Sequence, residues 1–146
     1  MPSSRDEETT RILLDLSRLL RNLTRLVGGA DDGPAMTATQ RIALVELGDG
    51  GSMRLSELAT RMGVSAPTAS RSVEVLHELG LAERVPDATD RRAVKIDLTP
   101  AGRELLAERH AKAQAAFEPA VASLSAAERK HLSALLHRMT DTLRSR

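Results

Sequence analysis

Apolar side chains recur at helical spacing along most of the chain, which predicts a mainly helical fold. Between residues 5 and 27 they lie three or four residues apart, the interval that places side chains on one face of an α-helix. The residues on this face are Ile12, Leu16, Leu19, Leu23 and Leu26. Leu13 and Leu20 widen it. We therefore expect one long N-terminal helix whose broad apolar face needs a partner helix.

Capping signals predict three shorter helices after a loop rich in glycine. Thr37 and Gln40 form a capping box for a helix that ends at the glycines following residue 47. Ser56 is the predicted cap of a short helix that stops at Gly63. Ser65 is the predicted cap of the next helix, with Pro67 in its first turn. The buried stripe expected on that helix is Ala69, Val73, Leu76 and Leu79.

The apolar pattern then changes to a period of two, which predicts strands. Residues 81–85 and 93–98 are the expected arms of a β-hairpin, with a turn at residues 86–90, and residues 53–55 are a candidate third strand. Two adjacent helices followed by a hairpin make a winged helix-turn-helix. The predicted fold class is therefore mainly α with a small β-hairpin (α+β).

Two further helices are predicted after the hairpin. The first begins at Thr99-Pro100, because proline suits the first helical position. The second begins at another capping box, formed by Ser125 and Glu128. This last helix is expected to bury a stripe of Leu132, Leu135, Leu136, Met139 and Leu143.

Composition argues against several classes of function. The formal net charge is only +1, so bulk charge does not indicate a nucleic-acid partner. The chain has no cysteine, which removes disulfide scaffolds, thiolate nucleophiles and cysteine-based metal or redox sites. Phe117 is the single aromatic residue, which argues against binding of single strands by base stacking. No apolar run approaches the ~20 residues of a membrane span, so we expect a soluble cytoplasmic protein with no membrane partner.

The sequence shows no pattern typical of catalysis. It contains neither a nucleophile elbow nor a glycine-rich phosphate-binding motif. No two of its four histidines have the i, i+4 spacing of helical metal sites; these are His77, His110, His131 and His137. We expect no enzyme, no cofactor and no metal site, while a zinc site assembled from separate elements stays open.

A series of short motifs occupies the middle of the chain. They are Met36-Thr37-Ala38-Thr39-Gln40, Leu55-Ser56-Glu57-Leu58-Ala59, Val64-Ser65, Leu79-Gly80-Leu81 with Arg84, Asp87-Ala88-Thr89-Asp90-Arg91-Arg92, and Leu98-Thr99-Pro100-Ala101-Gly102. Their order and spacing resemble the MarR family of winged-helix transcription regulators, closely between residues 36 and 106. The most specific part is the Asp-Arg-Arg wing followed by Leu-Thr-Pro-x-Gly.

The resemblance implies a homodimer that binds double-stranded, palindromic operator DNA and usually represses a neighbouring operon. It implies a division into an N-terminal dimerisation helix and loop (1–35), a winged helix-turn-helix DNA-binding domain (36–99) and C-terminal dimerisation helices (100–146). Such regulators often lose DNA affinity when they bind a small ligand, frequently a phenolic or other lipophilic compound. The sequence does not identify that ligand and does not distinguish a repressor from an activator.

The expected DNA contacts lie at the start of the second helix of the pair, which reaches base edges in the major groove. The outward positions there are Ser65, Ala66, Pro67, Thr68, Ser70 and Arg71. Arg71 is the one residue among them that can form two hydrogen bonds with a guanine. Ser65 can serve as helix cap, as phosphate contact or as both.

The predicted wing carries two adjacent arginines. By resemblance, Arg91 enters the minor groove, where the negative potential is strongest, and Arg92 lies near the backbone. Asp90 is expected to brace the wing by pairing with an arginine, and the less favoured alternative is that it only forms the turn. Arg54 is a further candidate for the DNA face.

The terminal helices are expected to form a dimer layer, because a chain of this size cannot easily bury both of their apolar faces. Packing within one subunit is the alternative. The residues expected in the interface are Ile12, Leu16, Leu19, Leu23, Leu132, Leu136 and Met139. A winged helix that binds another protein is the alternative function, but it would need neither an outward Arg71 nor the arginines of the wing.

Overall fold

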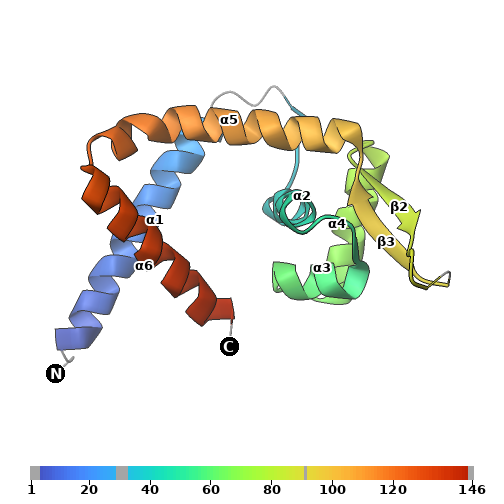
Figure 1. Cartoon of the computed structure of the whole chain (residues 1–146), viewed down its shortest axis with the longest axis horizontal. Coiled ribbons are helices and arrows are strands. Elements are labelled where there is room, and N and C mark those ends of the chain that lie inside the picture. The colour runs from blue at the N-terminus through green and yellow to red at the C-terminus, as the bar shows by residue number, and fades with distance from the viewer. Residues whose placement is uncertain (1–3, 29–32, 91, 145–146) are drawn as a thin grey trace. The chain divides into compact units, whose positions relative to one another are not determined.

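The structure is a computed structural model that describes residues 4–28, 33–90 and 92–144 (Figure 1). The chain divides into two compact units. One unit comprises residues 30–111, and the other combines residues 1–29 with residues 112–146. The predicted loop after the first helix lies largely outside the described residues, as do Arg91 and the side chain of Leu26.

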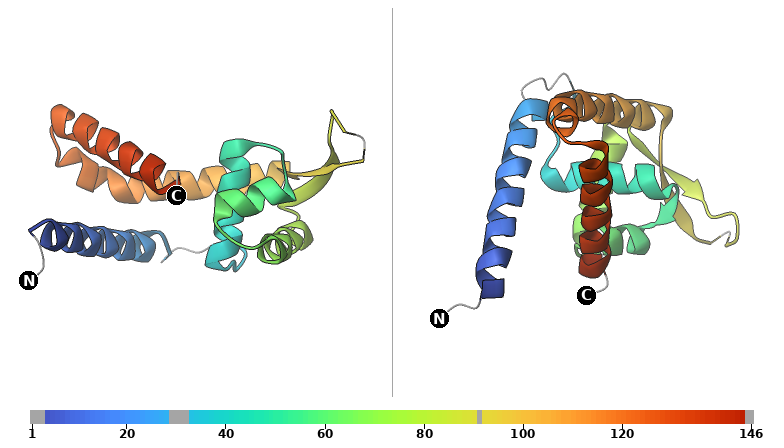
Figure 2. Two further views of the ribbon diagram at one scale, coloured as in Figure 1. Left: turned by 90° about the horizontal axis from the view of Figure 1, so that it is seen from below. Right: turned by 60° about the vertical axis from the view of Figure 1, so that its left-hand side comes forward.

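The unit formed by residues 30–111 is the predicted winged helix-turn-helix. Its helices are α2 (Ala38–Gly50), α3 (Leu55–Met62), α4 (Ala66–Glu78) and the first part of α5 (Pro100–Ala122). Its strands are β1 (Met53–Arg54), β2 (Ala82–Pro86) and β3 (Val94–Leu98), in the antiparallel order β1-β3-β2. Figure 2 shows the β2–β3 hairpin extending away from α2, α3 and α4 as a wing. The predicted fold class and the candidate third strand are confirmed.

One apolar core holds this unit together. All of its buried apolar residues lie between Met36 and Leu106. Leucines from every layer are fully buried in it, namely Leu44 on α2, Leu58 on α3, Leu76 on α4 and Leu98 on β3. The helix pair and the wing are therefore positioned by the same set of apolar contacts.

Local capping chemistry sets most helix boundaries as predicted. The Thr37 box is complete, because Thr37 N donates to Gln40 Oε1 at 2.8 Å and Gln40 N donates to Thr37 Oγ1 at 3.3 Å. Ser65 is the N-cap of α4. Gly63 ends α3 in the left-handed region at φ 66°, a conformation in which a side chain would be strained.

Two details of the sequence prediction are wrong. Ser56 is not a cap, because α3 begins at Leu55 directly after β1 and its N-cap, Arg54, makes no side-chain capping bond. Leu79 does not join the buried stripe of α4 and is 40% exposed. Leu79 is the C-cap, and the chain leaves the helix at the next residue, Gly80, whose φ is 70°, so no further turn of α4 covers this side chain.

The hairpin is joined to α5 by a tight corner around Thr99. Thr99 Oγ1 donates to the carbonyl oxygen of Gly80 at 2.6 Å and Thr99 N donates to that of Leu81 at 3.0 Å. Gly102 follows in the first turn of α5, and a Cβ atom at this position would overlap the carbonyl oxygen of Leu81. The Thr-Pro-x-Gly motif is thus a packing requirement of this corner.

Replacing Gly102 with alanine should therefore destabilise the protein. Alanine gains about 1 kcal/mol of helix propensity, but overpacking against fixed backbone costs about 3 kcal/mol. We expect a net loss of about 2 kcal/mol in the free energy of unfolding, measured by urea denaturation. Gly33→Ala is the matched control, because its Cβ would meet only side-chain atoms at an ordinary 3.4 Å. Equal stability of the two variants would contradict the overlap at Gly102.

The second unit contains α1 (Ser4–Gly28), the end of α5 and α6 (Ala126–Arg144). The Ser125 capping box that begins α6 is confirmed by hydrogen bonds of 2.8 and 3.3 Å with Glu128. None of the described helices is both long and apolar enough to cross a membrane. The expectation that α6 buries its apolar stripe is wrong for the single chain, since all five residues of the stripe are exposed. Helix periodicity identifies an apolar face but does not say which molecule covers it.

Candidate nucleic-acid interface

The outer face of α4 is the first part of the candidate interface. Its inner face is buried through Ala69, Ser72, Val73 and Leu76, which leaves Arg71 exposed on the other side. Among the predicted contact residues Ser65, Ala66 and Pro67 are also exposed, whereas Thr68 and Ser70 are half-buried. Arg71 makes no ion pair within the described part of the chain. Its guanidinium is therefore available to an outside partner.

Ser65 and Thr68 satisfy each other at the start of α4. The Oγ of Ser65 accepts from Thr68 N at 3.4 Å and lies 2.9 Å from Thr68 Oγ1. Both hydroxyl groups retain hydrogen-bonding capacity, since each can donate one bond and accept two. The structure thus makes Ser65 a cap without preventing it from contacting a phosphate.

The wing is the second part of the candidate interface. Its two strands pair from Ala82 opposite Leu98 to Pro86 opposite Val94. The turn is closed by Asp87 N, which donates to the carbonyl oxygen of Ala93 at 3.1 Å. Arg92 is exposed, and Arg91 lies outside the described residues.

Asp90 has two modest roles in this turn. Its Oδ1 accepts from the backbone N of Arg92 at 3.0 Å, which closes the turn locally. Its Oδ2 lies 3.6 Å from Nη2 of Arg54, and both side chains are about half exposed. Exposed ion pairs of this kind contribute little to stability.

A much tighter carboxylate lies three residues earlier, at Asp87, which is only 3% exposed. Its Oδ2 accepts from Arg54 Nε at 3.1 Å and from Arg54 Nη2 at 2.9 Å. Its Oδ1 accepts from Thr89 N at 3.0 Å and Thr89 Oγ1 at 2.8 Å, and lies 3.8 Å from Lys95 Nζ. The backbone and side-chain hydrogen bonds of Thr89, followed by that of Arg54, hold the pKa of Asp87 well below its usual range.

Sequence reasoning treated Asp87 as a turn residue and missed its pairing with Arg54. One local signal was present, because an aspartate with a threonine two residues later is typical of an Asx turn. The partner was not visible, since Arg54 lies 33 residues earlier in the chain. Arg54 itself, a candidate for the DNA face, is turned toward the wing carboxylates.

Acid should remove the contribution of Asp87 to stability. Because its pKa is lower in the folded protein than in the unfolded chain, ionised Asp87 favours folding above about pH 4, and this effect is lost as pH falls toward the folded value. The Tm of Asp87→Asn should lie below that of the original protein at neutral pH, and the gap should narrow below about pH 4. A gap that stayed constant from pH 7 to about pH 2.5 would contradict this assignment.

The histidines are not arranged around a shared site. No group of three potential metal ligands occurs among the described residues. His77, in the last turn of α4, donates from Nδ1 to the carbonyl oxygen of Ala82 at 3.0 Å. That bond ties the end of α4 to the start of β2.

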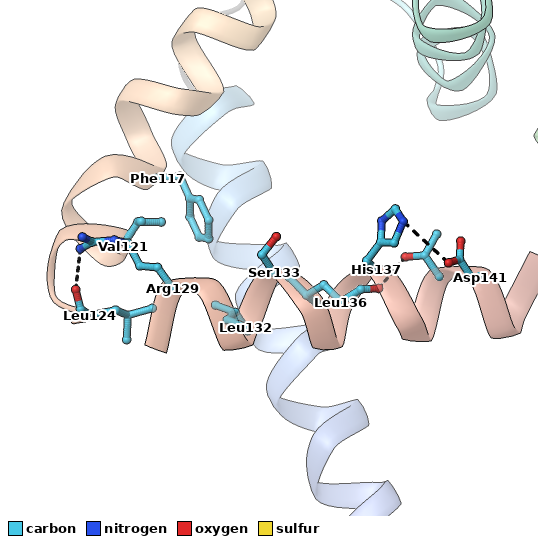
Figure 3. A pocket seen from close by; sticks show the side chains of 10 residues that line it. Phe117, Val121, Leu124, Arg129, Leu132, Ser133, Leu136, His137 and Asp141 are labelled. Carbon is cyan, nitrogen blue, oxygen red and sulfur yellow. Dashed lines mark hydrogen bonds and ion pairs between the residues drawn. The ribbon is translucent and has the colours of Figure 1, made fainter. Parts of the chain in front are cut away.

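A second exposed surface lies on the terminal helices. An open, largely apolar groove of about 610 Å³ separates the end of α5 from α6. Figure 3 shows Phe117 pointing from α5 toward Leu132 and Leu136 on α6. The polar residues that line it are Arg129, Ser133, His137, Thr140 and Asp141, and His137 Nε2 lies 3.7 Å from Asp141 Oδ2.

The residues predicted for dimerisation are accessible in the single chain. On α6, Leu132, Leu136 and Met139 are 40, 44 and 42% exposed. On α1, Ile12 and Leu19 are exposed, and Leu16 and Leu23 are half-buried. Apolar exposure of this extent over α1 and α6 is typical of an interaction surface.

Known proteins with a similar sequence or fold include transcriptional regulators. Residues 36–93 match the family model described as the MarR family. The chain is 34% identical over 109 residues to the HTH-type transcriptional repressor NicR of Pseudomonas putida, covering 75% of this chain and 69% of NicR. The crystal structure of RV1404 from Mycobacterium tuberculosis superposes with a TM-score of 0.75 at 27% identity, covering 97% of this chain and 96% of that one. The DNA binding of BpsR from Bordetella bronchiseptica is regulated by 6-hydroxynicotinic acid. Its structure superposes with a TM-score of 0.69 at 26% identity, covering 97% of this chain and 99% of BpsR.

Proposed function

Because the chain belongs to the MarR family of transcriptional regulators, we propose that it acts as a homodimer that binds a palindromic operator and represses a neighbouring operon. Members of this family are regulators that bind DNA and are not enzymes. NicR, a relative, is named as a repressor, which supports repression over activation. We place this activity in the cytoplasm, where the chromosome of a bacterium lies.

One observation carries the homodimer. The unit that contains α1 and α6 has no buried residue among those described, while the whole apolar core lies in the other unit. A compact unit without a core is not stable alone, since burial of apolar surface is the main favourable term in folding. A second copy supplies the missing partner faces, and a two-fold axis makes each face serve both subunits. We propose that residues 1–35 and 100–146 contribute to this dimer layer, while the first part of α5 also packs in the core of the other unit, and that residues 36–99 bind DNA.

The candidate interface favours duplex DNA over a protein partner. Arg71 is exposed on the helix that enters the major groove in helix-turn-helix proteins, and Arg92 is exposed on the wing. We propose that Arg71 contacts a guanine, that Arg91 enters the minor groove, and that Arg92 binds the backbone. Ser65, Ala66, Pro67, Thr68 and Ser70 line the same helix start and complete the proposed contact.

The experiment that tests this function uses the duplex upstream of the coding sequence. We expect an electrophoretic shift at lower protein concentration than with a scrambled duplex of equal length. Footprinting should show two protected half-sites about one helical turn apart. Equal affinity for both duplexes would reject sequence-specific binding and favour the protein-interaction alternative.

We further propose a small lipophilic or phenolic effector. The DNA binding of BpsR is regulated by 6-hydroxynicotinic acid, a hydroxylated aromatic acid, which supports the phenolic kind of compound. With Phe117 as the single aromatic residue, the contacts must come mainly from aliphatic side chains.

A further inference from the structure

We propose that Asp87 is the residue that positions the wing for DNA, by holding Arg54 of β1 and Lys95 of β3 against the wing turn. This inference rests on the proposed DNA-binding function and assigns a role within it. Asp90, the expected brace, has the lesser part in this arrangement.

The outer face of the sheet brings two cations together. Arg54 and Lys95 are directly opposite each other in the β1–β3 ladder, so their side chains emerge on the same face. Like charges in this position repel. Asp87 lies between them, 2.9 Å from Arg54 Nη2 and 3.8 Å from Lys95 Nζ, and its single negative charge serves both. The attraction links residues of β1, β3 and the turn that follows β2.

The side chain of Arg54 connects β1 to the wing turn, a connection that the backbone of this short strand does not make. Strand β1 is only two residues long and pairs with β3 at two positions, so the ladder holds it weakly. The Arg54 backbone is also the N-cap residue of α3, the first helix of the helix-turn-helix pair. Its guanidinium therefore joins the start of that pair to the wing, and the charge-assisted hydrogen bonds that Nε and Nη2 both donate to Asp87 Oδ2 fix its direction.

Asp87 also shapes the wing turn itself. Through Oδ1 it accepts two hydrogen bonds from Thr89, and through its own N it closes the hairpin on Ala93. All of these bonds lie outside the apolar core. Loss of the Asp87 charge should therefore change the direction of the wing without unfolding the unit that carries it.

The two aspartates of the wing allow a matched test. Asp87→Asn keeps the shape of the side chain but removes the charge that Arg54 and Lys95 share. Asp90→Asn is the control, because an asparagine can still accept the bond from Arg92 N. We expect Asp87→Asn to weaken operator binding about tenfold or more, because the proposed contacts of the wing arginines depend on the position of the wing. Asp90→Asn should bind within about threefold of the original protein, since exposed pairs contribute little.

A double-mutant cycle separates positioning from a general structural effect. In the variant Arg91→Ala/Arg92→Ala the wing has lost its proposed contacts, so adding Asp87→Asn should change affinity less than about threefold. An Asp87→Asn effect of equal size in both backgrounds, or none in either, would overturn the inference. If Asp87→Asn does not fold, Arg54→Lys replaces it under the same criteria. Lysine keeps the charge but cannot donate the two hydrogen bonds that Nε and Nη2 of Arg54 make to Asp87.

Failure of the proposed function would look different. In that case the original protein would not prefer the operator, or the loss of both wing arginines would leave binding unchanged. Either result rejects the wing contact, and with it the positioning role. A clear effect of the wing arginines together with normal binding by Asp87→Asn would reject the positioning role alone.

Discussion

Replacing Leu136 with glutamate should convert the protein from a dimer into a monomer. Leu136 lies in the groove between α5 and α6 and on the exposed apolar stripe of α6. In the proposed dimer the new carboxylate is buried without a partner, which costs at least about 3 kcal/mol. The two-fold axis repeats the change in the second subunit. The combined loss of about 6 kcal/mol corresponds to a roughly 10⁴-fold weaker dimer.

Sedimentation over a range of protein concentrations measures this change directly. Ala134→Glu is the matched control, since it adds the same charge to the opposite, polar side of the same helix. The control should sediment as a dimer and the Leu136 variant as a monomer. A dimeric Leu136→Glu variant would remove the α6 stripe from the interface. The monomer should also lose most of its operator affinity, because one subunit engages only one half-site.

Arg71→Ala and Arg91→Ala should each weaken operator binding by about 1–3 kcal/mol per half-site. A guanidinium that reads a guanine edge contributes to discrimination between base pairs, so Arg71→Ala should also tolerate substitutions at one operator position. A guanidinium in the minor groove responds to negative potential, so Arg91→Ala should mainly flatten the dependence of affinity on salt.

Titration of operator duplexes at several salt concentrations distinguishes these two effects. Arg138→Ala on α6 is the control, because it removes the same charge from a helix outside the proposed interface. Its affinity should match that of the original protein. If Arg71→Ala retained both affinity and base preference, α4 would not be the reading helix.

The net charge of only +1 predicts weak non-specific binding of DNA. The two positive charges of Arg54 and Lys95 are balanced by the carboxylates of Asp87 and Asp90, so they add little to a general attraction for phosphate. Arg71 and Arg92 remain exposed on the proposed interface. A protein built in this way should bind non-specific DNA weakly and depend on a matched palindromic site, because non-specific affinity comes almost entirely from phosphate neutralisation.

Features that depend on neighbours in the chain were predictable from the sequence. The capping boxes at Thr37 and Ser125 join residues three positions apart, and the structure contains both. Gly63 ends α3 for a reason local to its own backbone. The helical and two-residue periods also placed the hairpin and the outward position of Arg71 correctly. The same information, with the order of motifs, sufficed for the fold class and the family.

Features that depend on distant contacts came only from the tertiary structure. The pairing of Asp87 with Arg54 joins residues 33 positions apart, so spacing in the chain contains no trace of it. The overlap that makes Gly102 necessary involves the carbonyl of Leu81 across the corner. The sequence alone determined which residues are apolar and at what period they recur. The tertiary structure decided which apolar faces the chain buries by itself, because burial depends on the neighbours that folding brings together.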